Sequence, residues 1–237
     1  MNARPIFAAE GIGKRFGERV VLKAASMWAH AGRIHAVFGS NGCGKTTLLK
    51  IGAGVLAMDH GVVHMRGQSF LRPRHGRLAR LGLYYLPDDA GLPMHLTVGD
   101  ALRWLHRTFA GREPADVLER LGLTARASQR PYELSGGELK RAGVAAALVR
   151  NPVVLLADEP FAGIAPLDAE RIADGLRLLA RDGAAVIVTG HEVPELLQMA
   201  TDITWVTAGT SHGLGTAAAA LGHEQFRREY LGTWSRS

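Results

Sequence analysis

Residues 39–47, GSNGCGKTT, have the types and the spacing of a loop that binds phosphate. The pattern Gly-x-x-x-x-Gly-Lys-Thr is the P-loop motif, whose glycines let the backbone turn so that successive N–H groups face an anion. In such a loop Lys45 contacts the β- and γ-phosphates of a nucleotide, and Thr46 is a ligand of Mg²⁺. The candidate nucleotide-binding residues are Gly39, Ser40, Asn41, Gly42, Cys43, Gly44, Lys45, Thr46 and Thr47.

The motif requires a strand before it and a helix after it. Residues 33–39 are mostly apolar and predict a short buried strand, whereas residues 45–51 have helical periodicity. The glycines then lie at a strand-to-helix turn, where a helix N-terminus can face a phosphate. A glycine-rich turn that only caps a structural helix is the alternative.

A second set of reactive residues follows two other predicted strands. Asp158 and Glu159 follow the apolar run 153–157, and His191 follows residues 185–189. In an open α/β sheet the carboxyl ends of parallel strands meet at one crevice, so we expect these side chains beside the P-loop. There Asp158 can hold Mg²⁺ and Glu159 can polarise a water molecule. Two surface acids and a structural histidine are the alternatives.

The sequence LSGGE at residues 134–138 precedes a strongly helical segment. Ser135 and Glu138 fit a capping box, which is the simplest interpretation. A capping box does not need Gly136 and Gly137, whereas a backbone that approaches a phosphate at a helix N-terminus does. The paired glycines therefore indicate a second phosphate-binding helix N-terminus.

The N-terminal segment also carries one candidate binding residue. Residues 6–26 alternate apolar and polar side chains and predict two antiparallel strands joined near Phe16. Phe16 either stacks on an adenine ring, a contact of about 1–3 kcal/mol, or packs as an ordinary core phenylalanine.

The middle of the chain predicts a helical insertion between strands of one sheet. Residues 83–86 are an apolar strand, and residues 97–123 change to helical spacing. Residues 72–80 are expected to form a basic, proline-interrupted connection. The last predicted elements, residues 202–206 and 224–230, should complete the edge of the domain.

The composition predicts a compact α/β protein. The 237 residues are 47% hydrophobic, which is enough for a full core. No apolar run approaches a membrane span of ~18 residues and no signal-peptide layout is present, so we expect a cytoplasmic protein that touches a membrane only through a partner. The net charge of +6 is carried by scattered arginines, which favours a solvated surface over nucleic-acid binding.

Cys43 is the only cysteine, so the chain has neither a disulfide framework nor a cysteine-ligated metal cluster. Its place in the P-loop has two interpretations. In the first, the thiol simply fills a position where only a small side chain fits. In the second, the adjacent lysine and helix N-terminus favour the thiolate, so that alkylation would block the phosphate site.

In this order, Phe16, GSNGCGKTT, LSGGE, VVLLADEP and His191 resemble the nucleotide-binding subunit of ATP-binding-cassette (ABC) transporters. The resemblance covers nearly the whole chain, and DEPFAG and FRREYLG are similar to the small cassettes of branched-chain amino-acid importers and of lipopolysaccharide export. It implies an α/β P-loop ATPase fold with an antiparallel β subdomain and a helical subdomain. Residues 1–87 and 151–237 would form the core with the β subdomain, and residues 88–150 the helical subdomain that includes the signature LSGGE.

The same resemblance implies an activity and partners. ATP and Mg²⁺ are the expected cofactors, Glu159 and His191 the expected catalytic residues, and a transmembrane permease the expected partner. Two cassettes, identical or related, would form a head-to-tail dimer that sandwiches two ATP molecules. The signature residues that would face the partner's ATP are Ser135, Gly136, Gly137 and Glu138.

Two positions differ from the pattern of these relatives. A glutamine that ligates Mg²⁺ and senses the membrane subunits is replaced by Asp88, which can still ligate Mg²⁺ but is shorter and adds negative charge. The loop after Glu159 usually contains an aspartate where this chain has Ala165, a variant that amino-acid importers also show.

Two functions are compatible with these motifs, and a third is disfavoured. The first is the ATPase subunit of a transporter, and the second is a regulatory cassette that binds ATP and dimerises but hydrolyses it weakly. The third, a cassette ATPase of DNA repair or translation, usually needs coiled-coil arms or two cassettes per chain, for which this sequence has no room. The transported substrate and its direction depend on the membrane subunit.

Overall fold

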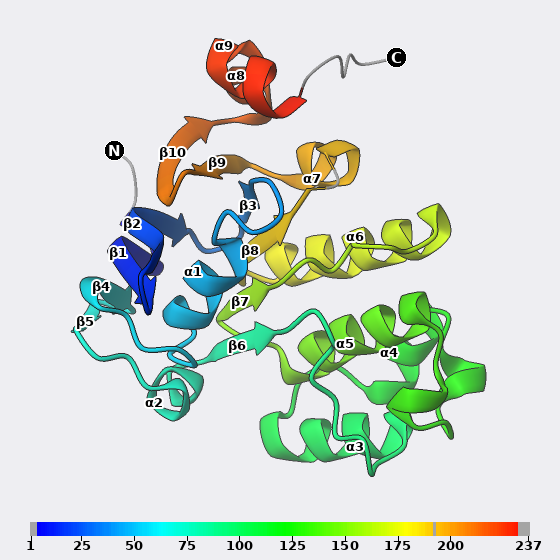
Figure 1. Ribbon diagram of the computed structural model, residues 1–237. Helices are drawn as coiled ribbons and strands as arrows, with labels where there is room; N and C mark the ends of the chain where they lie inside the picture. Colours follow the sequence, from blue (N-terminus) through cyan, green and yellow to red (C-terminus); the bar gives the residue numbers. More distant parts are fainter. Residues whose placement is uncertain (1–3, 192, 232–237) are drawn as a thin grey trace.

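The computed structural model describes residues 4–191 and 193–231, which form ten strands in one sheet and a set of helices around it (Figure 1). The strands are β1 (Phe7–Phe16), β2 (Arg19–Ala29), β3 (Ile34–Phe38), β4 (His60–Met65), β5 (Gln68–Phe70), β6 (Leu83–Leu86), β7 (Val154–Ala157), β8 (Ala185–Gly190), β9 (Asp202–Thr207) and β10 (Thr210–Gly215). The helices are α1 (Lys45–Gly52), α2 (His75–Arg80), α3 (Val98–Phe109), α4 (Pro114–Arg120), α5 (Gly136–Arg150), α6 (Pro166–Arg181), α7 (Val193–Met199), α8 (Ala217–Gly222) and α9 (Glu224–Phe226). Shorter turns are η1 (Thr124–Arg126), η2 (Pro131–Glu133) and η3 (Arg227–Leu231).

The sheet has a parallel part and an antiparallel part. Its order is β5-β4-β1-β2-β10-β9-β3-β8-β7-β6. Strands β6, β7, β8, β3 and β9 are parallel neighbours, whereas β2, β1, β4 and β5 pair antiparallel. Among the described residues, β10 joins the two parts through the pair Thr210 and Ala24. The parallel strands therefore end at one edge, next to the antiparallel hairpin.

Successive side chains along the parallel strands belong alternately to two hydrophobic cores. In β7, Leu155 and Ala157 belong to one core, and Val154 and Leu156 belong to the other. The first core includes α3 to α7, and the second includes α1 and the antiparallel strands. Apolar residues on both faces are typical of a parallel strand that is covered on both sides.

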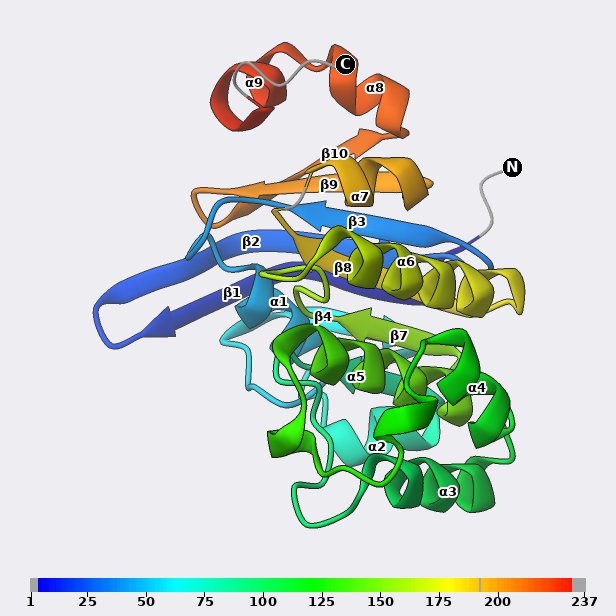
Figure 2. The same cartoon turned by 90° about the vertical axis from the view of Figure 1, so that its right-hand side faces the viewer.

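The central helix of the helical region is α5, and it is buried on every side between residues 141 and 150. It packs against α3, α4 and α6 (Figure 2). A helix that is apolar all round has to lie inside a protein, so this burial follows from its alanine- and valine-rich sequence. The helical region thus shares one core with the sheet. None of the described helices combines the length and the apolar content that crossing a membrane requires.

Most of the elements expected from the sequence are confirmed, with two corrections. The segment 72–80 is not only a connection, because its last six residues, His75–Arg80, form α2. Strand β9 does not complete the edge of the domain, because it lies between β10 and β3. Strands β5 and β10 and helix α7 were not expected from the sequence.

His35 in β3 is a buried histidine that makes stability depend on pH. Its Nε2 lies 2.8 Å from Oγ1 of Thr204, and the ring packs edge-on against Trp28 at 4.8 Å. Burial lowers the pKa of His35 from 6.5 to about 4. The folded state therefore keeps the ring neutral, while the unfolded state takes up a proton below pH 6.5.

We expect the free energy of unfolding to fall as the pH drops from 6.5 towards 4. The His35→Gln variant, whose amide does not titrate, should lack this part of the pH dependence. Urea unfolding at pH 7 and at pH 5 gives the free energy of unfolding of each protein. The difference in this free energy between the parent and the variant should change by about 2 kcal/mol between the two pH values. Parallel pH curves for the two proteins would contradict the assignment.

Candidate functional site

The carboxyl ends of adjacent parallel strands bring the predicted reactive residues together. Phe38 at the end of β3 is in register with Gly190 at the end of β8, and Val188 of β8 with Ala157 at the end of β7. The P-loop, His191 and the pair Asp158 and Glu159 directly follow these strands. The expected crevice is therefore present.

The P-loop glycines are required by conformation and by space. Gly42 and Gly44 have φ of 77° and 111°, in the region that side chains disfavour. A Cβ at Gly44 would lie 2.6 Å from the Leu22 side chain, and one at Gly39 would lie 2.6 Å from the carbonyl oxygen of Val206. The loop leads directly into α1, whose first residue is Lys45.

Lys45 is buried, and its ammonium group faces the inside of the loop. Its Nζ donates to the carbonyl oxygens of Gly39, at 2.7 Å, and Ser40, at 3.3 Å. It also lies 3.2 Å from Oε1 of Glu159, with the lysine side chain 3% exposed. A triphosphate that entered the loop would compete with Glu159 for this ammonium.

Asp158 accepts hydrogen bonds from three hydroxyl groups. The donors are Thr189 at 2.9 Å, Thr46 at 3.0 Å and Tyr85 at 3.2 Å. Burial raises the pKa of Asp158, an effect that these three bonds partly offset. Burial and the neighbouring Asp158 raise the pKa of Tyr85 far above 10, so its hydroxyl remains a donor. Thr189 and Tyr85 were not identified from the sequence.

Asp158 and Thr46 fit a magnesium ion by chemistry. Mg²⁺ prefers oxygen ligands and is usually held by one or two carboxylates together with substrate phosphates. The buried Asp158 carboxylate has hydroxyl partners and no lysine or arginine partner within the described ranges 4–191 and 193–231. In the same ranges no group of three or more His, Cys, Asp or Glu residues could hold a metal by itself.

Glu159 adopts an unusual backbone conformation. Its φ is 45°, which costs a residue other than glycine about 1–3 kcal/mol. The Glu159 N–H donates to Oγ1 of Thr189 at 3.0 Å, so the same threonine holds both acids. Its Oε2 lies 3.6 Å from Nδ1 of His191, which faces it from the end of β8. The carboxylate is thus placed between Lys45 and His191.

Asp88 lies at the end of β6, on the other side of the crevice. Its carboxylate is 67% exposed and pairs with Nζ of Lys140 at 2.5 Å. The same Nζ donates to the carbonyl oxygen of Glu159 at 2.5 Å. No spacing pattern pointed to Lys140. Ala165, the other unusual position, is the N-cap of α6 and gives that helix no side-chain cap.

Two cavities open around the P-loop. The first, of about 350 Å³, is lined by Phe16, Arg19, Val21, Gly42, Gly44, Lys45, Thr46, Thr47 and Glu159. The second, of about 500 Å³, is lined by Asn41, Gly42, Thr46, Lys50, Tyr85, Pro87, Asp88, Asp89, Asp158 and Glu159. Phe16 is 48% exposed and lines the first cavity, so its interpretation as a core residue is wrong. Arg19, which no sequence pattern indicated, adds a positive charge to this cavity.

The surroundings of Cys43 bear on its two interpretations. Burial raises the pKa of its thiol, and this effect outweighs Lys45 and the backbone N–H groups that lower it. The side chain packs against the core cluster around α1, and it lines neither P-loop cavity. The raised pKa and the packing of the side chain argue against the hypothesis of a reactive thiolate and agree with a small residue that fills space.

The residues of LSGGE start α5 with the expected capping box. The Ser135 Oγ accepts from the Glu138 N–H at 3.3 Å, and the Glu138 carboxylate accepts from the Ser135 N–H at 2.9 Å. The hydrogen bond from the Ser135 N–H and the hydrogen bond from Arg126 lower the pKa of Glu138 to about 2. A Cβ at Gly137 would collide with the Asp168 carboxylate, but one at Gly136 would meet nothing within 4 Å.

Neither a close contact within the described chain nor a positive φ therefore requires a glycine at position 136. None of Ser135, Gly136, Gly137 and Glu138 lines either P-loop cavity. Within one chain the two expected phosphate-binding helix N-termini are thus separate.

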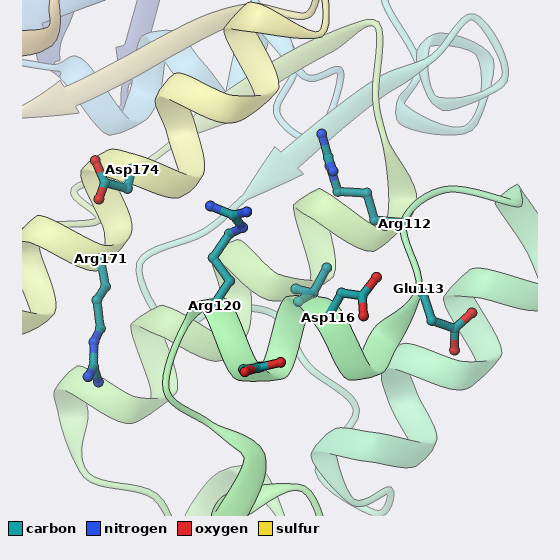
Figure 3. Close-up of a pocket in the computed structure, with 8 residues that line it drawn as sticks. Arg112, Glu113, Asp116, Arg120, Arg171 and Asp174 are labelled. Atoms are coloured by element: carbon teal, nitrogen blue, oxygen red, sulfur yellow. The ribbon is translucent and has the colours of Figure 1, made fainter.

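A larger cavity, of about 640 Å³, lies between α4 and α6 (Figure 3). It is lined by Arg112, Glu113, Asp116, Val117, Glu119, Arg120, Arg171 and Asp174. Figure 3 shows the labelled side chains pointing in different directions and not toward a common centre. Since both charge signs are mixed along its wall, this cavity does not define a ligand.

The chain is similar to known proteins over most of its length. Residues 22–162 match the protein family described as "ABC transporter". The lipopolysaccharide export system ATP-binding protein LptB of Haemophilus influenzae is 33% identical in an alignment of 235 positions that covers 96% of this chain and 97% of that protein. The autoinducer 2 import ATP-binding protein LsrA of an Enterobacter species is 31% identical over 86% of this chain and 42% of its own.

Solved structures show the same fold. A nucleotide-free ATP-binding cassette from an ABC transporter superimposes with a TM-score of 0.80 at 23% identity, over 97% of this chain and 100% of its own. A dimeric post-hydrolysis state of an ATP-binding cassette bound to ADP and Pi has a TM-score of 0.76 at 23% identity, over 88% of this chain and 98% of its own.

Proposed function

Because this chain belongs to the ABC transporter family, with the fold of its ATP-binding cassettes, we propose that it binds and hydrolyses ATP as a subunit of a transporter. The observation that carries the proposal is the placement of Glu159 beside Lys45 and His191 at the mouth of the P-loop. ATP hydrolysis needs a group that orients water next to a held γ-phosphate, and the contacts of this carboxylate with Lys45 and His191 support that role.

Each residue has a role in the proposed reaction. The P-loop N–H groups and Lys45 bind the β- and γ-phosphates, and Phe16 stacks on the adenine ring. Thr46 and Asp158, with Asp88 nearby, would hold Mg²⁺, which neutralises charge on the phosphates. Glu159 orients the attacking water, and His191 stabilises the γ-phosphate from the same chain.

We also propose a head-to-tail dimer of two cassettes, identical or related, that docks on a transmembrane permease at the cytoplasmic face of a membrane. Gly136 supports the dimer, because no atom of its own chain lies within 4 Å of the place where its Cβ would be. The backbone there is open to the ATP that a partner cassette would carry. Residues 88–150 would form the helical subdomain, and residues 1–87 and 151–237 the core with the β subdomain.

A steady-state phosphate-release assay with magnesium ATP tests the proposed hydrolysis. Turnover above the uncatalysed background supports the ATPase. ATP binding without turnover would leave the regulatory cassette as the better function, although the retained Glu159 and His191 argue against it.

The open space at Gly136 yields a specific prediction for the dimer. We expect Gly136→Ala to lower ATP turnover at least tenfold without lowering the melting temperature, because the added methyl group blocks a partner's phosphate and touches nothing in its own chain. Gly76→Ala is the matched control, since Gly76 is also helical and a methyl group added there would also meet nothing within 4 Å. Equal turnover of the two variants would contradict the proposed role.

A further inference from the structure

Lys140 joins three segments that meet at the site. It belongs to α5, and its side chain is only 11% exposed. Its Nζ lies 2.5 Å from Oδ1 of Asp88, which follows β6, and 2.5 Å from the carbonyl oxygen of Glu159, which follows β7. One ammonium group therefore ties the helical region to both strand ends.

Glu159 needs such support because its backbone is strained. Its φ of 45° lies in the left-handed region, where a side chain is disfavoured. Thr189 accepts from its N–H at 3.0 Å, and Lys140 donates to its carbonyl oxygen. Both peptide groups that flank the Glu159 side chain are thus held by other residues, and the direction of the carboxylate follows from them.

We propose that Lys140 is a positioning residue that holds Glu159 in the conformation required for water activation, with Asp88 anchoring its ammonium group. The inference rests on the proposed ATPase function. Lys140 lines neither P-loop cavity, so it acts through Glu159 and not on the nucleotide.

The position of Lys140 in α5 gives this contact a further consequence. Gly136 and Lys140 are four residues apart, so they lie on the same face of the helix. A ligand that shifts the exposed start of α5 also shifts Lys140, and with it the Glu159 carbonyl. Lys140 therefore links the occupancy of the LSGGE segment to the alignment of Glu159.

The test compares Lys140→Met, which removes the charge but keeps the chain length, with Lys140→Arg, which restores a charged donor. We expect Lys140→Met to lower kcat about tenfold or more while KM for ATP stays within about twofold of the parent, because a hydrogen bond to a charged donor is lost. Lys140→Arg should recover most of kcat. Lys23→Met, at an exposed lysine outside both cavities, is the control and should behave as the parent.

A second measurement does not depend on turnover. Hydrogen exchange of residues 158–162, followed without nucleotide, should be at least about tenfold faster in Lys140→Met than in the parent or in Lys23→Met, because the Glu159 turn is released. Parent-like kcat together with parent-like exchange would overturn the inference. If the parent itself hydrolyses no ATP, the proposed function fails, but the exchange measurement still decides whether Lys140 holds Glu159.

Discussion

Replacing Glu159 by glutamine is expected to lower ATP turnover about a hundredfold, because the amide cannot accept a proton from the attacking water. ATP binding should be retained or tightened. The carboxylate lies 3.2 Å from the Lys45 ammonium and would compete with a phosphate for it, whereas an uncharged amide competes less. Steady-state phosphate release and ATP titration measure the two effects separately.

The same variant should accumulate an ATP-bound dimer, because binding continues while hydrolysis does not. Light scattering with and without magnesium ATP would detect the doubled mass. Glu170→Gln, at an exposed carboxylate of α6, makes the same chemical change away from the crevice and should hydrolyse ATP at the parent rate. Parent-level turnover in Glu159→Gln would sink the proposed role of this residue.

Replacing Lys45 by alanine is expected to abolish stabilisation by ATP. In the parent, magnesium ATP at a hundredfold over its Kd should raise the free energy of unfolding by about 2.7 kcal/mol. The variant loses the ammonium group that faces the loop carbonyls of Gly39 and Ser40, where the phosphates are expected. Thermal unfolding with and without ATP measures the difference within each protein, so a change in intrinsic stability does not affect the comparison.

Lys23→Ala provides the control for this experiment, because Lys23 is exposed on β2 and lines neither cavity. It should keep the full ATP-dependent shift. An undiminished shift in Lys45→Ala would show that the nucleotide binds elsewhere.

The position of the site was predictable because its residues obey a local rule. Each reactive residue directly follows a short apolar strand, and the carboxyl ends of parallel strands meet at one edge. Asp158, Glu159 and His191 could therefore be placed beside the P-loop without knowledge of the strand order. The capping box of Ser135 and Glu138 was equally local and is confirmed.

The strand order was not predictable, because pairing between distant segments determines it. The apolar pattern of β9 fits a strand inside a sheet as well as a strand at its edge. The structure places β9 between β10 and β3. Thr189 and Tyr85 were missed because a single hydroxyl carries no spacing pattern, although Thr189 stands two residues before His191. The sequence left two interpretations of Cys43 open because its burial, which raises the pKa of the thiol against the effect of the nearby lysine, follows from tertiary packing.

The strand order also has a consequence for synthesis on the ribosome. Both neighbours of β3 in the sheet, β8 and β9, come from residues 185–207. Thr46 and its partner Asp158 are separated by 112 residues, which at usual elongation rates correspond to roughly 6 to 22 seconds. At the end of that interval β8 and β9 have not yet been made, so the apolar β3 has had two unpaired edges throughout. The nascent chain is therefore open to aggregation or to a chaperone. A site that includes both Thr46 and Asp158 exists only after residue 158 has been made, so a nucleotide that needs both residues can stabilise the finished fold but cannot guide its first steps.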